Sequence, residues 1–152
     1  MISPIQTRRH WIRQIAFEPG ERLIKNSKYN AQFSLSVEQR EKHSWHVVLS
    51  VKFDASPPEE ATFKGRFDYE GVFDIHPDFP EEKAPDLVRM NGGAILYGAI
   101  REQVLNLTSR SKHGPFEMPT IDARMFLEKP KPKKKAKTKT AGKKTAKKAT
   151  KR

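Results

Sequence analysis

The histidines are the side chains with the most specific chemical potential in this sequence, because imidazole binds metal ions and transfers protons near neutral pH. His43 and His46 form a closely spaced pair. In a strand, side chains three residues apart point to opposite faces, so the two could share an ion only if His43 lies in a turn. We therefore predict no metal site, and we assign surface positions to the isolated histidines: His10, His76 and His113.

Other kinds of catalytic site also lack support in the sequence. The chain has no cysteine, which excludes thiolate catalysis, disulfide bonds and cysteine-based zinc sites. No nucleophile elbow, Walker loop or dinucleotide fingerprint occurs, and two glycines at a helix start, Gly92 and Gly93, usually serve geometry rather than anion binding. Acidic residues between Asp74 and Asp86 are typical of a solvated loop. We expect no enzyme activity and no cofactor.

Positive charge is concentrated at one end of the chain. The 152 residues carry a net charge of +12, with 30 Lys and Arg against 18 Asp and Glu. Thirteen of the basic residues lie in 129–152, a segment without an acid or an apolar side chain larger than alanine, so the remainder is close to neutral. We predict one domain over 1–128 and a disordered basic tail over 129–152. The tail's lysine clusters are candidate polyanion contacts: Lys133, Lys134, Lys135, Lys143, Lys144, Lys147 and Lys148.

Four segments alternate apolar and polar residues with a period of two, as half-buried strands do. They cover His10–Phe17, Tyr29–Glu38, Trp45–Ala55 and Phe63–Ile75. The first is the least regular, because Arg13 and Gln14 interrupt both faces, and it suits an edge of the sheet. Short polar connections favour an antiparallel β-meander.

A helix and a long connection complete the predicted α+β fold. Apolar residues recur at helical spacing from Leu96 to Leu107, with Asn91 as the expected N-cap and the sequence SKHG as the end. Three prolines between Ile75 and Asn91 predict a crossover loop without regular structure. One helix covers only part of a four-stranded apolar face, so we expect the chain to oligomerise.

Large apolar residues in loops and at element ends are the remaining functional signal. Aromatic and methionine side chains on adaptable surfaces are typical of proteins that bind varied nonpolar segments. Burial in the core is an equally good explanation for Trp45 and Tyr97. The predicted client-binding residues are Trp45, Phe79, Leu87, Met90, Tyr97, Met125 and Phe126.

Several segments in one order resemble the SecB export chaperones. The helix sequence REQVLNLTSR and the exit PFEMPTIDARMF resemble the end of that fold, and IRQIAFEP, HVVLSVKFDA and TFKGRFDYEGVFDI resemble its first, third and fourth strands. The resemblance spans roughly 9–127. It implies an ATP-independent chaperone that holds unfolded polypeptide or preprotein clients in a nonpolar groove. It also implies a homotetramer built as a dimer of dimers.

The sequence departs from the family where clients pass to the SecA motor. Glu18 matches an acidic position of the family's first strand, whereas Gln14 and Arg66 replace acids. The family's second helix, which covers the groove, is missing or reduced to a turn after Leu127. These departures weaken the expectation of SecA as a partner and leave two roles open, protein export and a role outside general export such as toxin–antitoxin control.

Two alternatives remain from the sequence. The first is a SecB-like chaperone, in which the tail binds nucleic acid or anionic lipid, or merely solubilises the protein. The second is a nucleic-acid-binding or nucleoid-associated protein, in which the sheet domain only oligomerises basic tails. The N-terminal segment lacks the apolar run of a signal peptide, and no run of about 18 apolar residues predicts a membrane span. We therefore expect a cytoplasmic protein.

Overall fold

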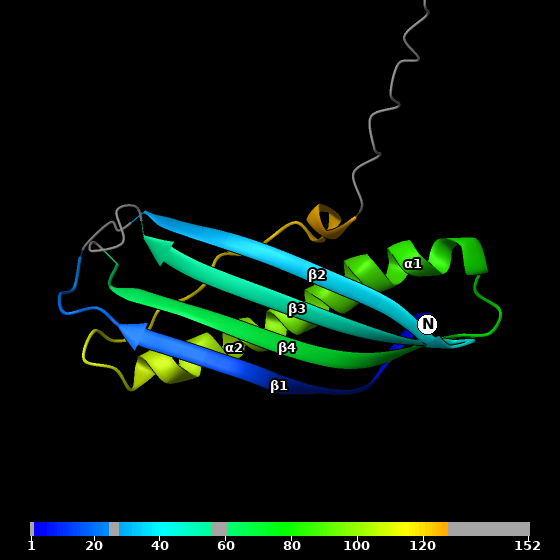
Figure 1. The fold of residues 1–152 in the computed structure, drawn as a ribbon, viewed down its shortest axis with the longest axis horizontal. Coiled ribbons are helices and arrows are strands. Elements are labelled where there is room, and N and C mark those ends of the chain that lie inside the picture. The colour runs from blue at the N-terminus through cyan, green and yellow to red at the C-terminus, as the bar shows by residue number, and fades with distance from the viewer. Residues whose placement is uncertain (1, 25–27, 56–60, 128–152) are drawn as a thin grey trace, which may run out of the picture.

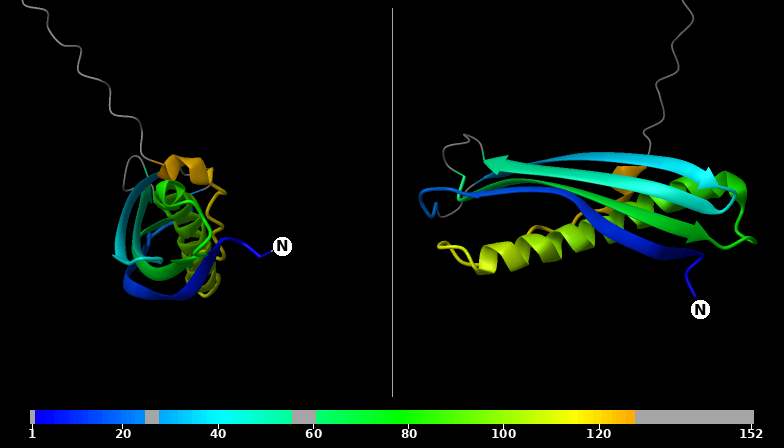
Figure 2. Two further views of the ribbon diagram at one scale, coloured as in Figure 1. Left: turned by 90° about the vertical axis from the view of Figure 1, so that its right-hand side faces the viewer. Right: turned by 60° about the horizontal axis from the view of Figure 1, so that its bottom comes forward.

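A computed structural model describes residues 2–24, 28–55 and 61–127. One antiparallel sheet packs against a long helical segment and the chain that follows it, so the α+β class is confirmed (Figures 1 and 2). Its strands are β1 (Ile5–Pro19), β2 (Tyr29–Glu41), β3 (Ser44–Ala55) and β4 (Phe63–Ile75). The predicted basic tail lies outside the described residues.

The strand order is β1-β4-β3-β2. The last three strands form a meander as predicted, with β2 paired to β3 and β3 to β4. The first strand differs, because β1 pairs with β4 rather than with its neighbour in sequence, β2. Consecutive strands β1 and β2 therefore lie at opposite edges of the sheet in this chain.

The irregular alternation in the first strand has a structural cause. Its pairing with β4 shifts register between Thr7 and Arg9 and again between Ile12 and Gln14. Such β-bulges place two residues opposite one and interrupt the period of two, which explains the break at Arg13. The prediction that this segment is an edge strand is confirmed.

One face of the sheet supplies most of the core. The alternating residues of β3 are buried from Trp45 to Ala55, and those of β4 are buried from Phe63 to Ile75. In contrast, the matching β2 side chains of Phe33, Leu35 and Val37 remain half-buried. The apolar face is thus sealed in its centre and less completely covered toward β2.

The helical segment begins earlier than the sequence predicted. A 3-10 turn (η2, Glu81–Lys83), α1 (Ala84–Leu87) and a π turn (η3, Val88–Gly92) lead directly into α2 (Gly93–Ser109). The predicted crossover loop therefore shrinks to 76–80, and Asn91 is no N-cap. Proline is tolerated in a first helical turn because the N–H it lacks would have no partner there, and Pro85 occupies that position in α1.

After α2 the chain returns along the helix in an extended form. Its end at Ser109 agrees with the predicted break, and Gly114 takes a positive φ of 80° in the following turn. Residues 115–127, which we call the strap, then run between α2 and the β2 side of the sheet (Figure 1). The strap ends in a short 3-10 turn, η4 (Ala123–Phe126). The prediction that the family's second helix is missing or reduced to a turn concerns the chain after Leu127, which lies outside the described residues.

Candidate functional site

The first part of the strap closes an aromatic cluster. The ring centroid of Phe116 lies 4.7 Å from that of Tyr29, 6.0 Å from that of Phe53 and 5.7 Å from that of Phe63. These partners belong to three different strands, so one side chain of the strap spans the inner face of the sheet. The Phe116 backbone N–H donates to Thr108 Oγ1 at 2.9 Å, which ties this point to the end of α2.

A second cluster lies where the strap ends. The Phe33 ring centroid is 5.8 Å from that of Tyr97 and 6.3 Å from that of Phe126. Phe126 packs directly on the helix backbone at Gly93, where an added Cβ would lie 2.6 Å from its ring. Glycine is therefore required at position 93, because the Phe126 ring lies too close to the helix backbone for a larger residue.

Two polar side chains of α2 hold the strap between these clusters. The Tyr97 hydroxyl donates to the Pro119 carbonyl at 2.7 Å, and Arg101 Nε donates to the Met118 carbonyl at 3.0 Å. Burial raises the pKa of Tyr97 above its ordinary value of 10.0, which favours the neutral hydroxyl that can donate. Met118 itself is buried.

A cleft of about 500 Å³ opens at the far end of the sheet. Trp45, Phe79 and Ile75 line it, together with the charged residues Glu81, Glu82 and Lys42. The half-buried row of Phe33, Leu35 and Val37, which we call the β2 track, leads along the sheet between the aromatic clusters and this cleft, since Val37 pairs with Val47 next to Trp45. Apolar surface therefore follows the β2 side over much of its length.

The predicted client-binding residues fall into three situations. Trp45 and Phe79 meet in the cleft, although the Trp45 side chain is largely buried. Tyr97 and Phe126 are buried and joined through Phe33. The remaining three lie on or near the surface, with Met125 exposed and Leu87 and Met90 half-buried.

The sequence interpretation missed the side chains that join these residues into one surface. Tyr29 and Phe33 were assigned only to a strand face, and the packing of half-buried Phe116 and buried Met118 against the core was not recognised. The alternation of large apolar residues in PFEMP was the available signal, because it predicts an extended segment with one buried side.

No cluster of three or more metal-binding side chains occurs within the described residues. His43 lies in the turn after β2, where its carbonyl accepts from the Ile75 N–H at 2.8 Å. His46 points to the outer face of the sheet and lies 3.1 Å from Glu70. The two imidazoles thus have separate structural settings.

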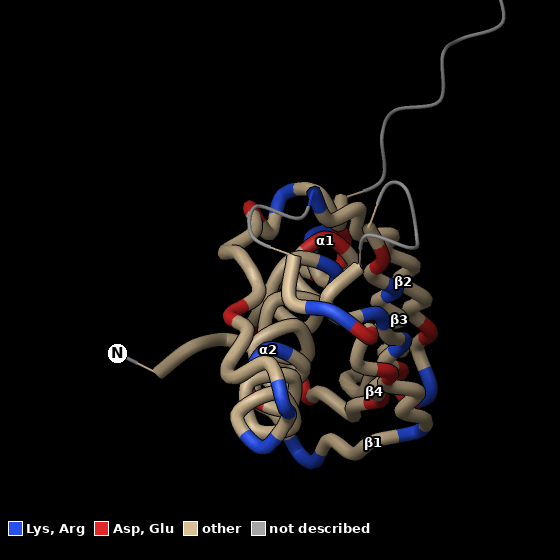
Figure 3. Tube along the Cα trace, turned by 90° about the vertical axis from the view of Figure 1, so that its left-hand side faces the viewer, with Lys and Arg blue, Asp and Glu red and all other residues tan. Residues whose placement is uncertain are grey.

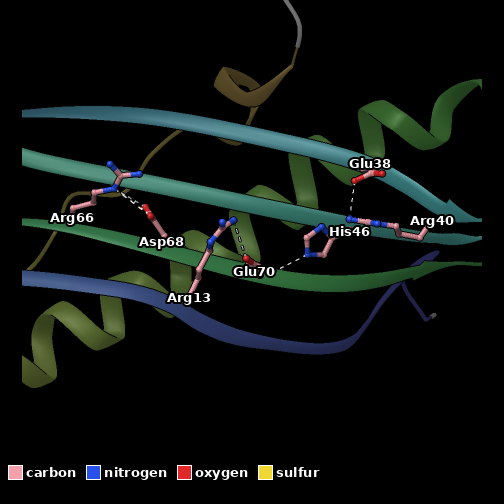
Figure 4. A network of polar contacts seen from close by, with 7 residues as sticks. All are labelled: Arg13, Glu38, Arg40, His46, Arg66, Asp68 and Glu70. Atoms are coloured by element: carbon pink, nitrogen blue, oxygen red, sulfur yellow. Dashed lines mark hydrogen bonds and ion pairs between the residues drawn. The ribbon is translucent and has the colours of Figure 1, made fainter.

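The outer face of the sheet carries paired charges (Figure 4). Glu70 contacts both Arg13 and His46 at 3.1 Å, and Arg66 donates to the buried Asp68 at 3.1 Å. Glu38 and Arg40 form a third pair. Along the described chain, basic and acidic residues are interspersed rather than segregated (Figure 3). This face offers neither a strongly acidic nor a strongly basic surface.

A comparison with family models decides the identity of the fold. Residues 3–137 match the model described as preprotein translocase subunit SecB, which is most of the chain. This chain belongs to the SecB family. The resemblance seen in the sequence motifs is confirmed, and the match extends beyond residue 128, the predicted end of the domain.

One solved structure shows the same fold as this chain. It is the Mycobacterium tuberculosis Rv1957 SecB-like chaperone in complex with a ChAD peptide from the HigA1 antitoxin, with a TM-score of 0.59, 19% identity, and coverage of 78% of this chain and 88% of that chain. A Streptococcus agalactiae protein of unknown function aligns with a TM-score of 0.45 and 13% identity, over 76% of this chain and 97% of that one. No curated protein sequence matches this chain.

Membership in the SecB family places the protein among chaperones. Within the described part of the chain, no helix is long and apolar enough to cross a membrane. Glu18 pairs with Lys64 at 3.2 Å, and Arg66 pairs with Asp68 at 3.1 Å. This part of the outer face is therefore close to electrically balanced.

Proposed function

We propose that this protein is an ATP-independent chaperone that holds unfolded polypeptides on the apolar surface of its β2 side. The observation that carries the proposal is the half-buried β2 track, which lies between the aromatic clusters at the strap and the cleft of Trp45 and Phe79. Such a surface binds through apolar area and adaptable side chains, which requires no fixed client sequence.

Suppression of aggregation tests this function directly. The full chain and a chain ending at Glu128 are each mixed with a thermally unfolding protein, and light scattering is recorded. Both should suppress scattering at comparable stoichiometry, because the apolar side chains named above precede residue 128. Scattering unchanged by the full chain would contradict the proposal.

We further propose that clients reach their destination without SecA. The paired charges at Arg66 and Asp68, and the neutral Gln14, leave little acidic surface for a basic recipient. A toxin–antitoxin role is the preferred alternative, and a general export role is the other. Calorimetric titration with purified SecA should show no difference in binding between the natural sequence and Glu18→Gln. If the natural sequence binds SecA and Glu18→Gln does not, the export role is supported instead.

We propose a homotetramer, a dimer of dimers, in the cytoplasm. The expectation that one helix leaves the centre of the apolar face uncovered is wrong, since Val47, Leu49, Val51 and Phe67 are fully buried within one chain. The apolar residues that support association are Ile12, Ile95 and Leu105, which remain exposed on the β1 edge and α2. Sedimentation at micromolar concentration should give the tetramer, and Ile12→Asp should dissociate it. A monomer at these concentrations would contradict the assembly.

A second candidate function rests on the charge of residues 129–152. Thirteen basic residues and no acid in this segment favour binding of nucleic acid or anionic lipid by counterion release. In that role the SecB fold would serve to bring several tails together. The proposal concerns the sequence alone, because these residues lie outside the part of the chain that the structure describes.

A further inference from the structure

The strap occupies the apolar surface that the proposed function requires. Phe116 covers aromatic rings of three strands, Met118 is buried, and Phe126 lies on Gly93 beside Phe33. A client segment could not contact these surfaces while the strap is in place. The resting chain therefore presents a groove that is already filled by a segment of its own.

The strap is held in the way a bound peptide would be held. Its attachments to α2 are hydrogen bonds between one backbone group and one side chain: Tyr97 to the Pro119 carbonyl, Arg101 to the Met118 carbonyl, and the Phe116 N–H to Thr108. Among the described residues, the backbone-to-backbone bonds of the strap stay within its own last turn, from Met125 to Asp122 and from Leu127 to Arg124. No strand ladder ties the strap to the sheet.

Segments with few backbone bonds open more easily than paired strands. Replacing the strap with an extended client segment would preserve the buried apolar area, because aromatic and aliphatic side chains would fill the same positions. The α2 donors would retain main-chain carbonyl partners, which every polypeptide supplies. The exchange would therefore cost less than exposing the groove to water.

We propose that the strap is an intramolecular client mimic, and that an extended peptide displaces it from the groove between α2 and β2. The preferred client segment then resembles the strap, with a large aromatic residue, a long aliphatic residue two positions later, and a second aromatic residue nearer its C-terminal end. This inference rests on the proposed chaperone function and names the class of peptide that the site selects.

Hydrogen exchange of the full chain tests displacement. The probe is reduced, carboxymethylated lactalbumin, whose binding is first established by anisotropy. With the probe bound, the backbone amide of Phe116, which donates to Thr108 in the resting chain, should exchange about tenfold faster or more, while amides in the centre of β3 and β4 remain protected. Unchanged or slower exchange in the strap, with the probe bound, overturns the displacement but not the chaperone function. Failure to bind any unfolded protein would overturn both.

A matched pair of variants provides an independent measurement. Met118→Ser weakens the binding of the strap in its own groove and should therefore raise the affinity for the probe by about threefold or more. Glu117→Ser alters the neighbouring exposed residue and should leave the affinity for the probe unchanged. Equal affinities of the two variants, both shown to be folded by thermal melting, would overturn the mimic. If hydrogen exchange in the strap became faster at higher protein concentration without the probe, the groove would bind a second copy of the chain. That result would also overturn the proposal that the strap mimics a client.

Discussion

Two helical glycines of α2 have opposite surroundings. An added Cβ at Gly93 would lie 2.6 Å from the Phe126 ring, whereas one at Gly98 would have no neighbour within 4 Å. Alanine favours a helix over glycine by about 1 kcal/mol, so both substitutions gain propensity. Only the substitution at Gly93 must also displace the ring of Phe126, and overpacking of this kind costs about 1–3 kcal/mol of stability.

In urea unfolding, Gly93→Ala and Gly98→Ala should therefore change the free energy of unfolding in opposite directions. We expect Gly98→Ala to raise the free energy of unfolding by about 0.5–1 kcal/mol. Gly93→Ala should lower it, because displacement of Phe126 outweighs the gain in propensity. If both variants were stabilised equally, the close contact between α2 and η4 would be wrong.

The strap's last turn contains a carboxylate with a strongly altered proton affinity. The side chain of Arg124 and its backbone N–H both hydrogen-bond Asp122, and they lower its pKa from 3.8 to about 2. A carboxylate whose folded pKa is lowered stabilises the folded state above its unfolded pKa. The contribution is lost as the pH falls from near 4 through about 2.

An NMR titration of the Asp122 carboxyl group measures this effect. The midpoint should lie near 2 in the natural sequence and move up toward 3.8 in Arg124→Gln, which removes the guanidinium. Lys83→Gln, a charge removal in a different helical turn, serves as the control and should leave the midpoint unchanged. A midpoint near 4 in the natural sequence would show that the ion pair is not formed in solution.

At the scale of elements, the strands were the most predictable part of the fold. Alternation in β3 and β4 survives in the structure because both lie inside the sheet and bury one face completely. Which strands pair with each other could not be predicted as easily. Nothing in the sequence of β1 specifies pairing with β4 rather than β2, because that choice depends on how the whole sheet covers its core.

The predicted start of the helix at Asn91 was wrong for a local reason. Pro77, Pro80 and Pro85 were taken together as loop signals, yet Pro85 lies in a first turn that tolerates it. The extended segment after the helix was predicted, but the packing of the strap was missed for a different reason. A segment held by side chains of α2 has no periodic signal of its own beyond Phe116 and Met118, and its binding surface exists only after the sheet and helix meet.

The segment from β4 to α2 provides a test of the cleft. Phe79→Ser combined with Met90→Ser removes apolar surface beside Trp45 and on η3, and should weaken holding of unfolded protein several-fold while the oligomer remains intact. Light scattering measures the first property, and sedimentation measures the second. Asp78→Ser, an exposed change next to Phe79, is the control. Unchanged holding in the double variant would place the client surface elsewhere.

At the scale of the whole molecule, the chain combines a nearly neutral domain with a basic segment. The domain's charges are paired across its outer face, as at Arg8 and Asp74, which lie 2.8 Å apart. Residues 129–152 hold the excess positive charge. The domain and this segment should therefore respond differently to salt, because apolar contacts are less sensitive to screening than charge contacts are.

Binding to duplex DNA at increasing salt separates the two parts. For the full chain, affinity should fall steeply and show little dependence on base sequence, with each phosphate contact contributing about −0.9 to the log–log slope. A chain ending at Glu128 should lose this binding and still hold unfolded protein, since its charges nearly cancel and it keeps the strap, α2 and the β2 track. Undiminished DNA binding by the shorter chain would favour the nucleic-acid role instead. The first residues to replace would then be Arg8, Arg9, Arg13 and Arg66. Loss of client holding would instead mean that the basic segment belongs to the client-binding site.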